Sequence, residues 1–397
     1  MKIILLCVFF PPLKVSAAIQ ISDLAKELSS QGHDITVLTP DSTLKKSFLI
    51  AKDKNIKILR IKSGKIRDVG LVKRAINEFF LPFQMIYRLS IIAHILKNNN
   101  LIVWWSPSIF LTPLVIYLKI ISRCKSYLIL RDIFPQWAID LGIIKNKILA
   151  LIFKTFYYFQ FLASDMVGIQ SFGDEKYIPK NFFRKRIKFE ILNNWYTPSV
   201  SKKESKFDLS STILRRRKIF VYAGNIGLAQ DVKVFIDLAK AFRNNDEIGF
   251  LFIGRGTLYE KLKKAVNEDF LNNVVFHEEI SNTEIQSIYK NCFAGLISLN
   301  SKHTTHNIPG KFISYLHSGL PVFAVVNKNN NIIDIINKND LGFATNSVDI
   351  KNLKKYFLDF IDMIDNKSDI QKRCQEFAFK NYNTKKIARQ IIASLNF

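Results

Sequence analysis

The segment 293–326 constrains the fold of this 397-residue chain more than any other. It begins with an apolar run, 293–299, that is typical of a buried parallel strand. A polar loop follows. Residues 310–318 then carry apolar side chains at helical spacing and end at Gly319, and 321–326 is a second apolar run. Two buried strands joined by a helix make a βαβ unit, so the chain is predicted to contain a parallel α/β sheet.

The polar loop and helix start of this unit have the features of an anion site. Lys311 lies in the first helical turn, directly after Pro309 and Gly310. Free backbone N–H groups, the positive end of the helix dipole and a lysine would meet there. The loop also follows a strand, and open α/β sheets bind ligands at the carboxyl ends of their strands. The alternative is that Lys311 is an ordinary solvated lysine.

Length and composition indicate a two-domain globular protein. A chain of 397 residues exceeds one ordinary hydrophobic core. Its 48% hydrophobic residues, with 33 Phe, exclude a disordered chain. The four cysteines are far apart in the sequence, and three lie in or beside apolar runs. We therefore expect reduced core residues of a cytosolic protein, without a disulfide framework or a metal site.

The formal net charge of +25 leaves three classes of partner: nucleic acid, an anionic membrane surface and phosphorylated substrates. The sequence contains no zinc-ligand pair, RNP-like motif or Arg-rich recognition helix, so no nucleic acid is expected as partner. An AT-rich genome would also enrich Lys, Asn, Ile and Phe without any functional cause.

The first half of the chain is predicted to form a doubly wound domain. Residues 2–10 imitate a signal peptide, but a predicted helix over 17–31 and strand over 33–38 favour a first buried strand. The apolar run 109–121 is expected to be a buried helix rather than a membrane span, because Thr112, Pro113 and Lys119 interrupt it. The further strands are expected at 56–61, 101–105, 127–130, 165–169 and 189–192.

Two predicted helical regions, 71–96 and 148–163, are rich in aromatic residues and also carry basic ones. Pro82 is expected to kink or split the first region. Such helices either lie on a membrane surface or bury their aromatics in the core and solvate their charges. The net charge favours the membrane surface.

A Ser- and Lys-rich segment, 198–215, is predicted to link an N-terminal domain, 1–197, to a C-terminal domain, 216–383. The second domain repeats the opening of the first, with a strand at 219–222, a glycine-containing loop and a helix. A final helix, about 384–397, is expected to pack back onto the first domain.

Four motifs in order carry a resemblance to a known family. They are 10–12 (FPP) before a helix ending at Gly32-His33, 131–135 (RDIFP), 223–230 (AGNIGLAQ) and 309–321 (PGKFISYLHSGLP). They resemble the opening, the HDLWP segment, the AGNxGxAQ turn and the PSKxxEYxxxGKP helix of the family-4 glycosyltransferases. The resemblance covers nearly the full length and is strongest to the bacterial branch that builds O-antigen and capsular polysaccharide. It implies the GT-B architecture, in which two Rossmann-like doubly wound domains face a central cleft.

The resemblance also implies a set of donor-side residues. Asn225 and Gln230 occupy positions where the wider family has Arg and Lys, which leaves Lys311 and Arg255 as the cations for the diphosphate. His306 and Ser314 occupy the positions of two family glutamates separated by seven residues. We expect His306 at the transferred sugar and Ser314 at the ribose hydroxyls. The remaining donor-side residues are expected to be Gly227, Glu278, Asn307, Ile308, Pro309 and Gly310.

On the acceptor side the resemblance implies Ser16, Ala17 and Arg131, the last in place of the usual histidine. Asp132 is expected to orient the acceptor or the donor sugar, and its alternative role is that of a turn or capping residue.

The implied activity is retaining glycosyl transfer. The donor is expected to be a nucleotide sugar, UDP-linked and with an N-acetylamino group, and the acceptor a polyprenyl-diphosphate-linked saccharide. The enzyme would be cytoplasmic and bound peripherally to the inner face of the cytoplasmic membrane. No Asp-x-Asp triplet follows a predicted strand, so no metal cofactor is expected. Negative charge on the departing diphosphate would be stabilised by preorganised donors.

Two other functions fit parts of this pattern. A nucleotide-sugar 2-epimerase on the same fold would not need membrane-facing helices. A non-catalytic sugar-binding or scaffold subunit would explain the missing glutamates, and it would bind nucleotides weakly or not at all.

Overall fold

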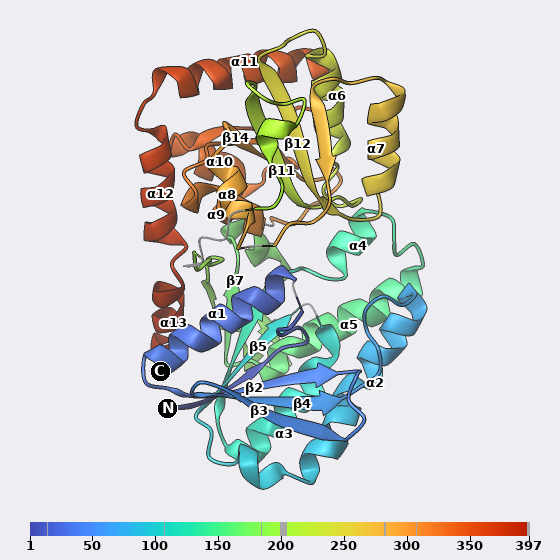
Figure 1. Ribbon diagram of the computed structural model, residues 1–397. Coiled ribbons are helices and arrows are strands. Elements are labelled where there is room, and N and C mark those ends of the chain that lie inside the picture. The colour runs from blue at the N-terminus through green and yellow to red at the C-terminus, as the bar shows by residue number, and fades with distance from the viewer. Residues whose placement is uncertain are drawn as a thin grey trace. The chain divides into compact units, whose positions relative to one another are not determined.

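The computed structural model describes residues 1–13, 15–106, 108–183, 185–198, 205–281, 283–306 and 308–394, and of Leu71 and Lys185 only the backbone (Figure 1). The chain divides into two compact units. Unit 1 comprises Met1–Trp195 and Thr384–Phe397, and unit 2 comprises Tyr196–Asn383. Asn307, one of the expected donor-side residues, lies outside the described residues.

Unit 1 alternates strands and helices in the manner of a doubly wound domain. Its main elements are β1 (Lys2–Leu6), α1 (Ser16–Ser30), β2 (Asp34–Asp41), β3 (Phe48–Asp53), β4 (Ile56–Lys62), α2 (Leu71–Ser90), η1 (Ala93–Leu96), β5 (Leu101–Ser106), η2 (Ile109–Leu111), α3 (Thr112–Ser122), β6 (Lys125–Leu130), α4 (Gln136–Asp140), α5 (Lys147–Ala163), β7 (Met166–Ile169), η3 (Phe172–Tyr177), β10 (Phe189–Ile191) and α13 (Thr384–Ala393). A separate hairpin pairs β8 (Asn181–Phe182) with β9 (Lys185–Arg186).

The eight strands of the main sheet of unit 1 follow the order β10-β7-β6-β5-β1-β2-β4-β3. All neighbours are parallel except β3 and β4. Both faces of β1 are buried, with Ile3 and Leu5 in one core cluster and Ile4 and Leu6 in the other. Such burial explains why this strand is continuously apolar. The α1 and α13 helices supply residues to the first cluster and pack on each other, while α2, α3 and α5 contribute to the second.

Three features of unit 1 differ from the expectations. β3 was not predicted, because its residues alternate between half-buried and exposed inside a strongly basic segment. The predicted split at Pro82 is wrong, since α2 runs unbroken through it, with Leu81 and Met85 fully buried beside it. The helix predicted within 109–121 is buried on one side only, because Ile116 and Ile120 are exposed. Among the described residues, no helix combines the length and the apolarity needed to cross a bilayer.

Unit 2 repeats the same alternation. Its elements are η4 (Leu209–Ser211), β11 (Lys218–Asn225), α6 (Lys233–Ala241), β12 (Ile248–Arg255), α7 (Tyr259–Glu268), β13 (Val274–His277), α8 (Ile285–Tyr289), β14 (Ala294–Ser298), α9 (Gly310–His317), β15 (Val322–Val325), α10 (Asn331–Lys338), β16 (Gly342–Thr345), α11 (Ile350–Asn366) and α12 (Ile370–Asn381). The described part of segment 198–215 packs on this unit, with Leu209 and Leu214 in its core.

The all-parallel sheet of unit 2 has the order β13-β12-β11-β14-β15-β16. From β11 the chain first adds strands on one side, β12 and β13, and then returns to the other side for β14. The strand order therefore reverses between β11 and β14. In open α/β sheets this is the place where loops diverge and ligands bind.

Candidate functional site

The loops at the reversal point of unit 2 are held together by their own hydrogen bonds. The 225–230 loop after β11 contacts the loop after β14 through Asn300. The Asn300 backbone N–H donates to the Ala229 carbonyl (2.9 Å), and its side-chain amide donates to the Leu228 carbonyl (3.1 Å). The Ile226 N–H donates to the Arg255 carbonyl at the end of β12 (2.8 Å). Three strand ends are thus joined into one framework around the start of α9.

Lys311 has an unusual place in this framework. Its Nζ atom lies 3.3 Å from the centre of the Tyr222 ring, over the end of β11. The atom is buried, and it has no hydrogen-bond partner among the described residues. Burial holds the pKa of Lys311 well below the usual 10.5. The structure therefore contradicts an ordinary solvated lysine, and a buried amino group without a hydrogen-bond partner among the described residues is a strong indication of a ligand site.

Tyr315, one turn further along α9, fixes the position of Lys311. Its hydroxyl accepts from the Ala223 N–H (2.8 Å) and donates to the Val221 carbonyl (3.1 Å). Both groups are on the edge of β11 where the pairing with β14 opens. Residues four apart lie on one face of a helix, so the same contact places Lys311 over β11.

Glycines allow the strand ends to approach this closely. Gly224 has φ of +135° and Gly254 +153°, conformations that other residues rarely adopt. A Cβ atom at Gly254 would lie 1.9 Å from the Gly224 carbonyl oxygen, and one at Gly224 would lie 3.3 Å from Cε of Lys311. The ends of β11 and β12 can therefore lie this close together, with Lys311 beside them, because these positions lack side chains.

The other expected donor-side residues of β11 and β12 lie at the same edge. Asn225 and Gln230 hydrogen-bond each other (2.8 Å), which fixes the loop between them. A Cβ at Gly227 would come within 2.9 Å of that Asn225 amide nitrogen, so a larger residue would have to displace this side chain. Arg255 is exposed and forms an ion pair with Glu279 (3.0 Å). An exposed pair of this kind contributes about 0–1 kcal/mol, so a diphosphate can displace the carboxylate.

The remaining expected residues surround the start of α9 or follow β13. Pro309 precedes the helix in an extended conformation and Gly310 is its first residue. Ile308 is a core residue, and His306 is almost fully buried in the loop. The Ser314 hydroxyl hydrogen-bonds with Tyr289. Glu278 is exposed directly after β13, beside Glu279.

Arg131 in unit 1 is a structural residue. Its guanidinium lies over the rings of Trp195 (4.7 Å) and Trp105 (5.4 Å) and donates to the carbonyls of Leu192 (3.0 Å) and Asn193 (3.3 Å). Burial lowers the pKa of Arg131 to about 9. The predicted direct role at the acceptor is thus not supported by the geometry, because the guanidinium is enclosed by these groups.

Asp132 follows at the carboxyl end of β6 and is available for chemistry. Its backbone carbonyl closes a turn by accepting from the Phe134 N–H (2.9 Å), while its carboxylate makes no hydrogen bond within the described residues. Burial raises the pKa of Asp132, and Arg131 opposes that rise. Ser16 is exposed at the start of α1, and Ala17 is half-buried next to it. Among the described residues, no side chain caps that helix start.

Several residues that build these sites were missed by sequence reasoning. They are Tyr222, Gly254, Glu279, Tyr315, Trp105 and Trp195. One signal was present: Tyr315 follows Lys311 by four residues, and Gly254 ends an apolar strand. The ring contacts of Arg131 join residues far apart in sequence, and nothing local indicates them.

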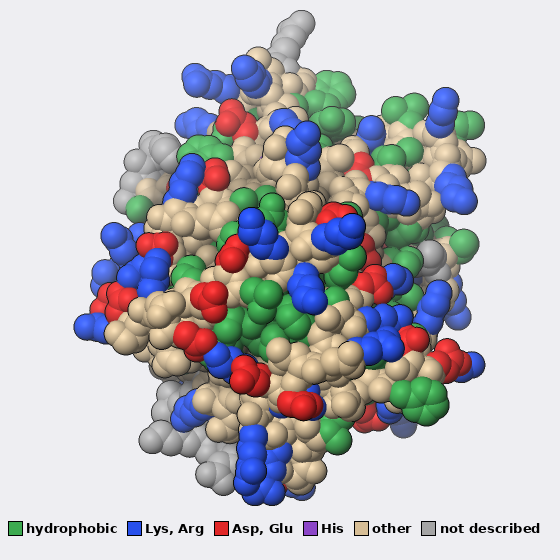
Figure 2. Space-filling view, turned by 90° about the horizontal axis from the view of Figure 1, so that it is seen from above, with side chains coloured by type: hydrophobic (Ala, Val, Ile, Leu, Met, Phe, Trp, Pro, Cys, Tyr) green, Lys and Arg blue, Asp and Glu red, His purple; other side chains and the backbone are tan. Residues whose placement is uncertain are grey.

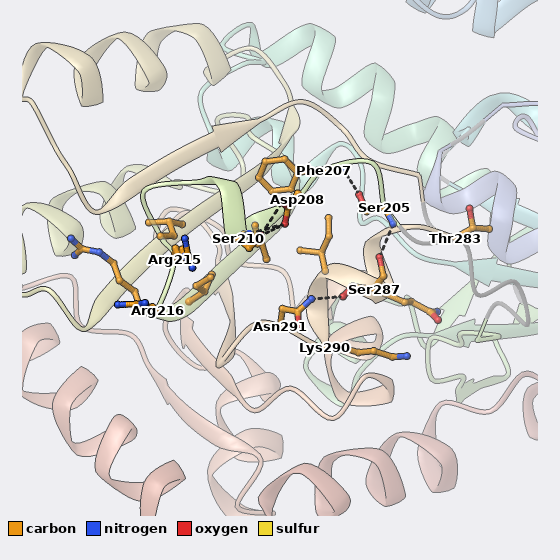
Figure 3. A pocket seen from close by; sticks show the side chains of 16 residues that line it. Ser205, Phe207, Asp208, Ser210, Arg215, Arg216, Thr283, Ser287, Lys290 and Asn291 are labelled. Atoms are coloured by element: carbon orange, nitrogen blue, oxygen red, sulfur yellow. Dashed lines mark hydrogen bonds between the residues drawn. The ribbon is translucent and has the colours of Figure 1, made fainter.

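A cavity of about 790 Å³ in unit 2 is a different place (Figure 3). Its lining includes Ile219 near the start of β11 and residues 207–210 and 214–217 before that strand, so it lies at the amino end of the sheet, away from Lys311. Arg215 and Arg216 lie at one end of the view and Lys290 lies apart from them, near Asn291, while the Asp208 carboxylate accepts hydrogen bonds from Ser210 (Figure 3). These charges do not converge on one point. Among the described residues, no three His, Cys, Asp or Glu side chains are grouped to hold a metal.

Comparison with known proteins identifies the C-terminal unit. Residues 204–390 match the family model described as Glycosyl transferases group 1. This region of the chain is similar to the group 1 glycosyltransferase domain. The expectation of a transferase enzyme is thereby confirmed.

More distant similarities extend over the rest of the chain. A protein described as "Probable glycosyltransferase WbjE", from Pseudomonas aeruginosa, is 20% identical over 278 residues, which cover 69% of this chain and 68% of that protein. A sucrose-phosphate synthase from Thermosynechococcus elongatus superposes with a TM-score of 0.75 at 13% identity, covering 99% of this chain and 98% of that one. HepE from Anabaena, solved in complex with UDP, gives 0.69 at 14% identity, covering 100% and 99%. The predicted fold class, two Rossmann-like domains of GT-B architecture, is confirmed.

Proposed function

We propose that this glycosyltransferase moves a sugar, with retention of anomeric configuration, from a nucleotide sugar to a lipid-linked saccharide. The donor is a UDP-sugar with an N-acetylamino group, and the product belongs to a surface polysaccharide such as O-antigen or capsule. The resemblance of 223–230 and 309–321 to the O-antigen branch supports this choice. HepE binds UDP, which supports the same nucleotide here.

The observation that carries the proposal is the unpartnered, buried Lys311 in a region similar to the group 1 glycosyltransferase domain. The site has a buried lysine amine, a helix start without a side-chain cap among the described residues, and glycines that let the strand ends lie close together. A diphosphate would give Lys311 the counter-charge that the described chain lacks. The exposed Arg255 would exchange Glu279 for the same ligand.

The reaction breaks the bond between the sugar C1 and the diphosphate oxygen and forms a bond from C1 to an acceptor hydroxyl on the same face. The acceptor proton passes to the departing phosphate oxygen, so no protein nucleophile is needed. Charge builds on the diphosphate in the transition state, and a preorganised cation and N–H groups stabilise it there. Asp132, a carboxylate of raised pKa in unit 1, would orient a sugar hydroxyl.

The acceptor in this proposal is a polyprenyl-diphosphate-linked saccharide, which requires the enzyme to work at the cytoplasmic face of a membrane. The net charge of +25 supports this location. No metal cofactor is proposed, and that absence is a prediction to be tested with and without magnesium.

The test is a transfer assay with radiolabelled UDP-, GDP- and dTDP-sugars and a detergent-dispersed polyprenyl-diphosphate saccharide. We expect label from one UDP-sugar to enter the lipid extract with retained configuration, and a loss of about 100-fold or more in Lys311→Ala. Conversion of the donor sugar without any acceptor would contradict the proposal in favour of an epimerase. Failure with every donor, by a folded protein, would equally contradict it.

A further inference from the structure

The α2 helix of unit 1 is apolar on two sides. One side is buried, with Leu81, Met85 and Leu89 in the core of unit 1. The other side is exposed, and its apolar residues continue to the residue after the helix. These are Val72, Ile76, Phe80, Phe83, Tyr87 and Ile91.

The exposed apolar residues of α2 form one stripe. Their spacings of four, four, three, four and four residues place them within about 100° of arc on a helix that turns 100° per residue. Val72, Tyr87 and Ile91 are 75%, 73% and 63% exposed. Isolated apolar residues are common on protein surfaces, but a stripe of five helical turns is not.

Neighbouring helices enlarge the stripe into a broader surface. Phe79 of α2 packs edge-on against Phe156 of α5 (5.7 Å), so the two helices are adjacent (Figure 1). The first turns of α5 expose Ile148, Leu149, Leu151 and Ile152, and α3, which contacts both helices, exposes Ile116 and Ile120. We call the exposed apolar residues of α2, α3 and α5 the apolar face.

The charge on and beside the helices of the apolar face is mainly positive. Residues 68–98 and 140–165 contain seven Lys or Arg and four acidic residues, Asp68, Glu78, Asp140 and Asp165. Two of these acids form ion pairs, Glu78 with Arg74 (2.7 Å) and Asp165 with Lys119 of α3 (2.6 Å). The face of the molecule seen in Figure 2 differs, because Lys and Arg there are interspersed with Asp and Glu.

We propose that the apolar face binds an anionic lipid surface. Its side chains would enter the boundary between headgroups and acyl chains, and the basic side chains beside it would contact anionic headgroups. A second copy of the chain fits less well, because a two-fold contact through this face would bring two mainly basic surfaces together. The proposal gives a structural basis to the membrane location in the proposed function and rests on it for its purpose, but its test is independent of sugar transfer.

The experiment is co-sedimentation of the full chain with vesicles of phosphatidylcholine alone or with 30% phosphatidylglycerol, at ~50 mM and ~300 mM salt. We expect binding to the anionic vesicles at low salt and at least tenfold weaker binding to the neutral ones or at high salt. A protein that ignores anionic vesicles at low salt would overturn the proposal.

Substitutions locate the contact. The double variant Tyr87→Ser/Ile91→Ser should partition about tenfold less, while Phe270→Ser, which removes a 91% exposed aromatic residue of unit 2, should not change binding. The triple variant Lys73→Gln/Lys147→Gln/Lys154→Gln should lose at least tenfold, and its control is Lys261→Gln/Lys328→Gln/Lys351→Gln in unit 2.

Three results would refute the assignment. One is equal vesicle binding by the variants and their controls. Another is a dimer in light scattering that Tyr87→Ser/Ile91→Ser converts to a monomer, because a second copy would then occupy the face. The third is that only variants with altered circular dichroism lose vesicle binding. In that case the milder variant Tyr87→Ser, if it stays folded, would bind vesicles like the wild type. Since UDP binding is measured separately on Lys311 variants, failure here is distinguishable from failure of the proposed function.

Discussion

At the scale of single residues, Lys311 is held in a position that costs stability. Its Nζ is buried over Tyr222 without a hydrogen-bond partner among the described residues. A buried, uncompensated amino group is unfavourable, whereas an apolar side chain of similar length fits the same space. We expect Lys311→Met to raise the free energy of unfolding of unit 2 by about 1–2 kcal/mol, measured by urea titration at pH 7. A decrease in stability would show that Lys311 stabilises the fold.

The proposal that Lys311 binds the diphosphate also predicts a pH dependence. Burial holds its pKa well below 10.5, and a bound diphosphate would raise it again. Tyr222 and Tyr315, which pack beside it, have pKa values raised by burial and stay neutral. Lys311 should therefore have one pKa in the free protein and a higher pKa in the UDP complex. At a pH between these two values, UDP binding should be coupled to uptake of a proton, and the affinity for UDP should fall as the pH rises.

This uptake is measurable at pH 8, above the second pKa of the terminal phosphate, about 6. The enthalpy of UDP binding measured by calorimetry should differ between phosphate buffer and Tris buffer, because the proton taken up comes from the buffer and the two buffers have different heats of ionisation. Equal enthalpies in the two buffers would mean that Lys311 is already charged before UDP binds.

The burial of His317 at the end of α9 leads to a second prediction, that the stability of the fold depends on pH. Its ring packs against Tyr196 (5.2 Å) and Phe379 (5.0 Å), and burial lowers its pKa to about 4. Below pH 6.5 the unfolded chain binds more protons at this residue than the folded chain, so stability is lost as pH falls from 6.5 toward 4. Between pH 7 and pH 5, the free energy of unfolding measured with urea should decrease in both proteins. We expect this decrease to be smaller in His317→Phe than in the wild type by about 1–2 kcal/mol. An identical pH dependence in the two proteins would refute this role.

At the scale of elements, the contact between α9 and β11 determines the geometry of the site. Tyr315→Phe would leave the Ala223 N–H buried without its acceptor and remove the bond to the Val221 carbonyl. We expect a loss of about 1–3 kcal/mol in unfolding free energy and weaker UDP binding, because the start of α9 is no longer held over β11. Tyr259→Phe is the control, since no hydrogen bond of that hydroxyl occurs among the described residues. Equal stability of the two variants would contradict the anchoring role.

Most elements were predictable because both sheets are buried on both faces. Strands such as β5 and β14 are continuous apolar runs, and helices such as α9 have apolar residues at helical spacing. β3 was missed because it is an edge strand paired only with β4, and none of its residues is fully buried inside a strongly basic segment. Pro82 was misleading because packing of the buried side of α2 outweighs the one backbone hydrogen bond that proline removes.

The candidate site was predictable only in part, for a related reason. Lys311 and the glycines follow from local patterns at strand ends and a helix start. The partners of Arg131, by contrast, come from two separate segments, Trp105 and residues 192–195, that the sheet order brings together. A sequence indicates which residue types follow each strand, but not which charged group another segment will enclose.

At the scale of the whole molecule, sugar transfer and membrane binding are assigned to different units. Lys311 belongs to unit 2 and the apolar face to unit 1. We therefore expect Lys311→Ala to bind phosphatidylglycerol vesicles like the wild type, and Tyr87→Ser/Ile91→Ser to bind UDP like the wild type. Both measurements use the full chain. A variant that loses both properties while it remains folded would contradict this separation.

The central claim is that the buried lysine at the reversal point of unit 2 holds the diphosphate of the donor. It is tested most directly by calorimetric titration of the wild type and Lys311→Ala with UDP, GDP and dTDP, with and without magnesium. The account predicts UDP binding that needs no magnesium and falls by about 100-fold or more in the variant. UDP binding of equal strength in both proteins, or no nucleotide binding by the wild type, would contradict it.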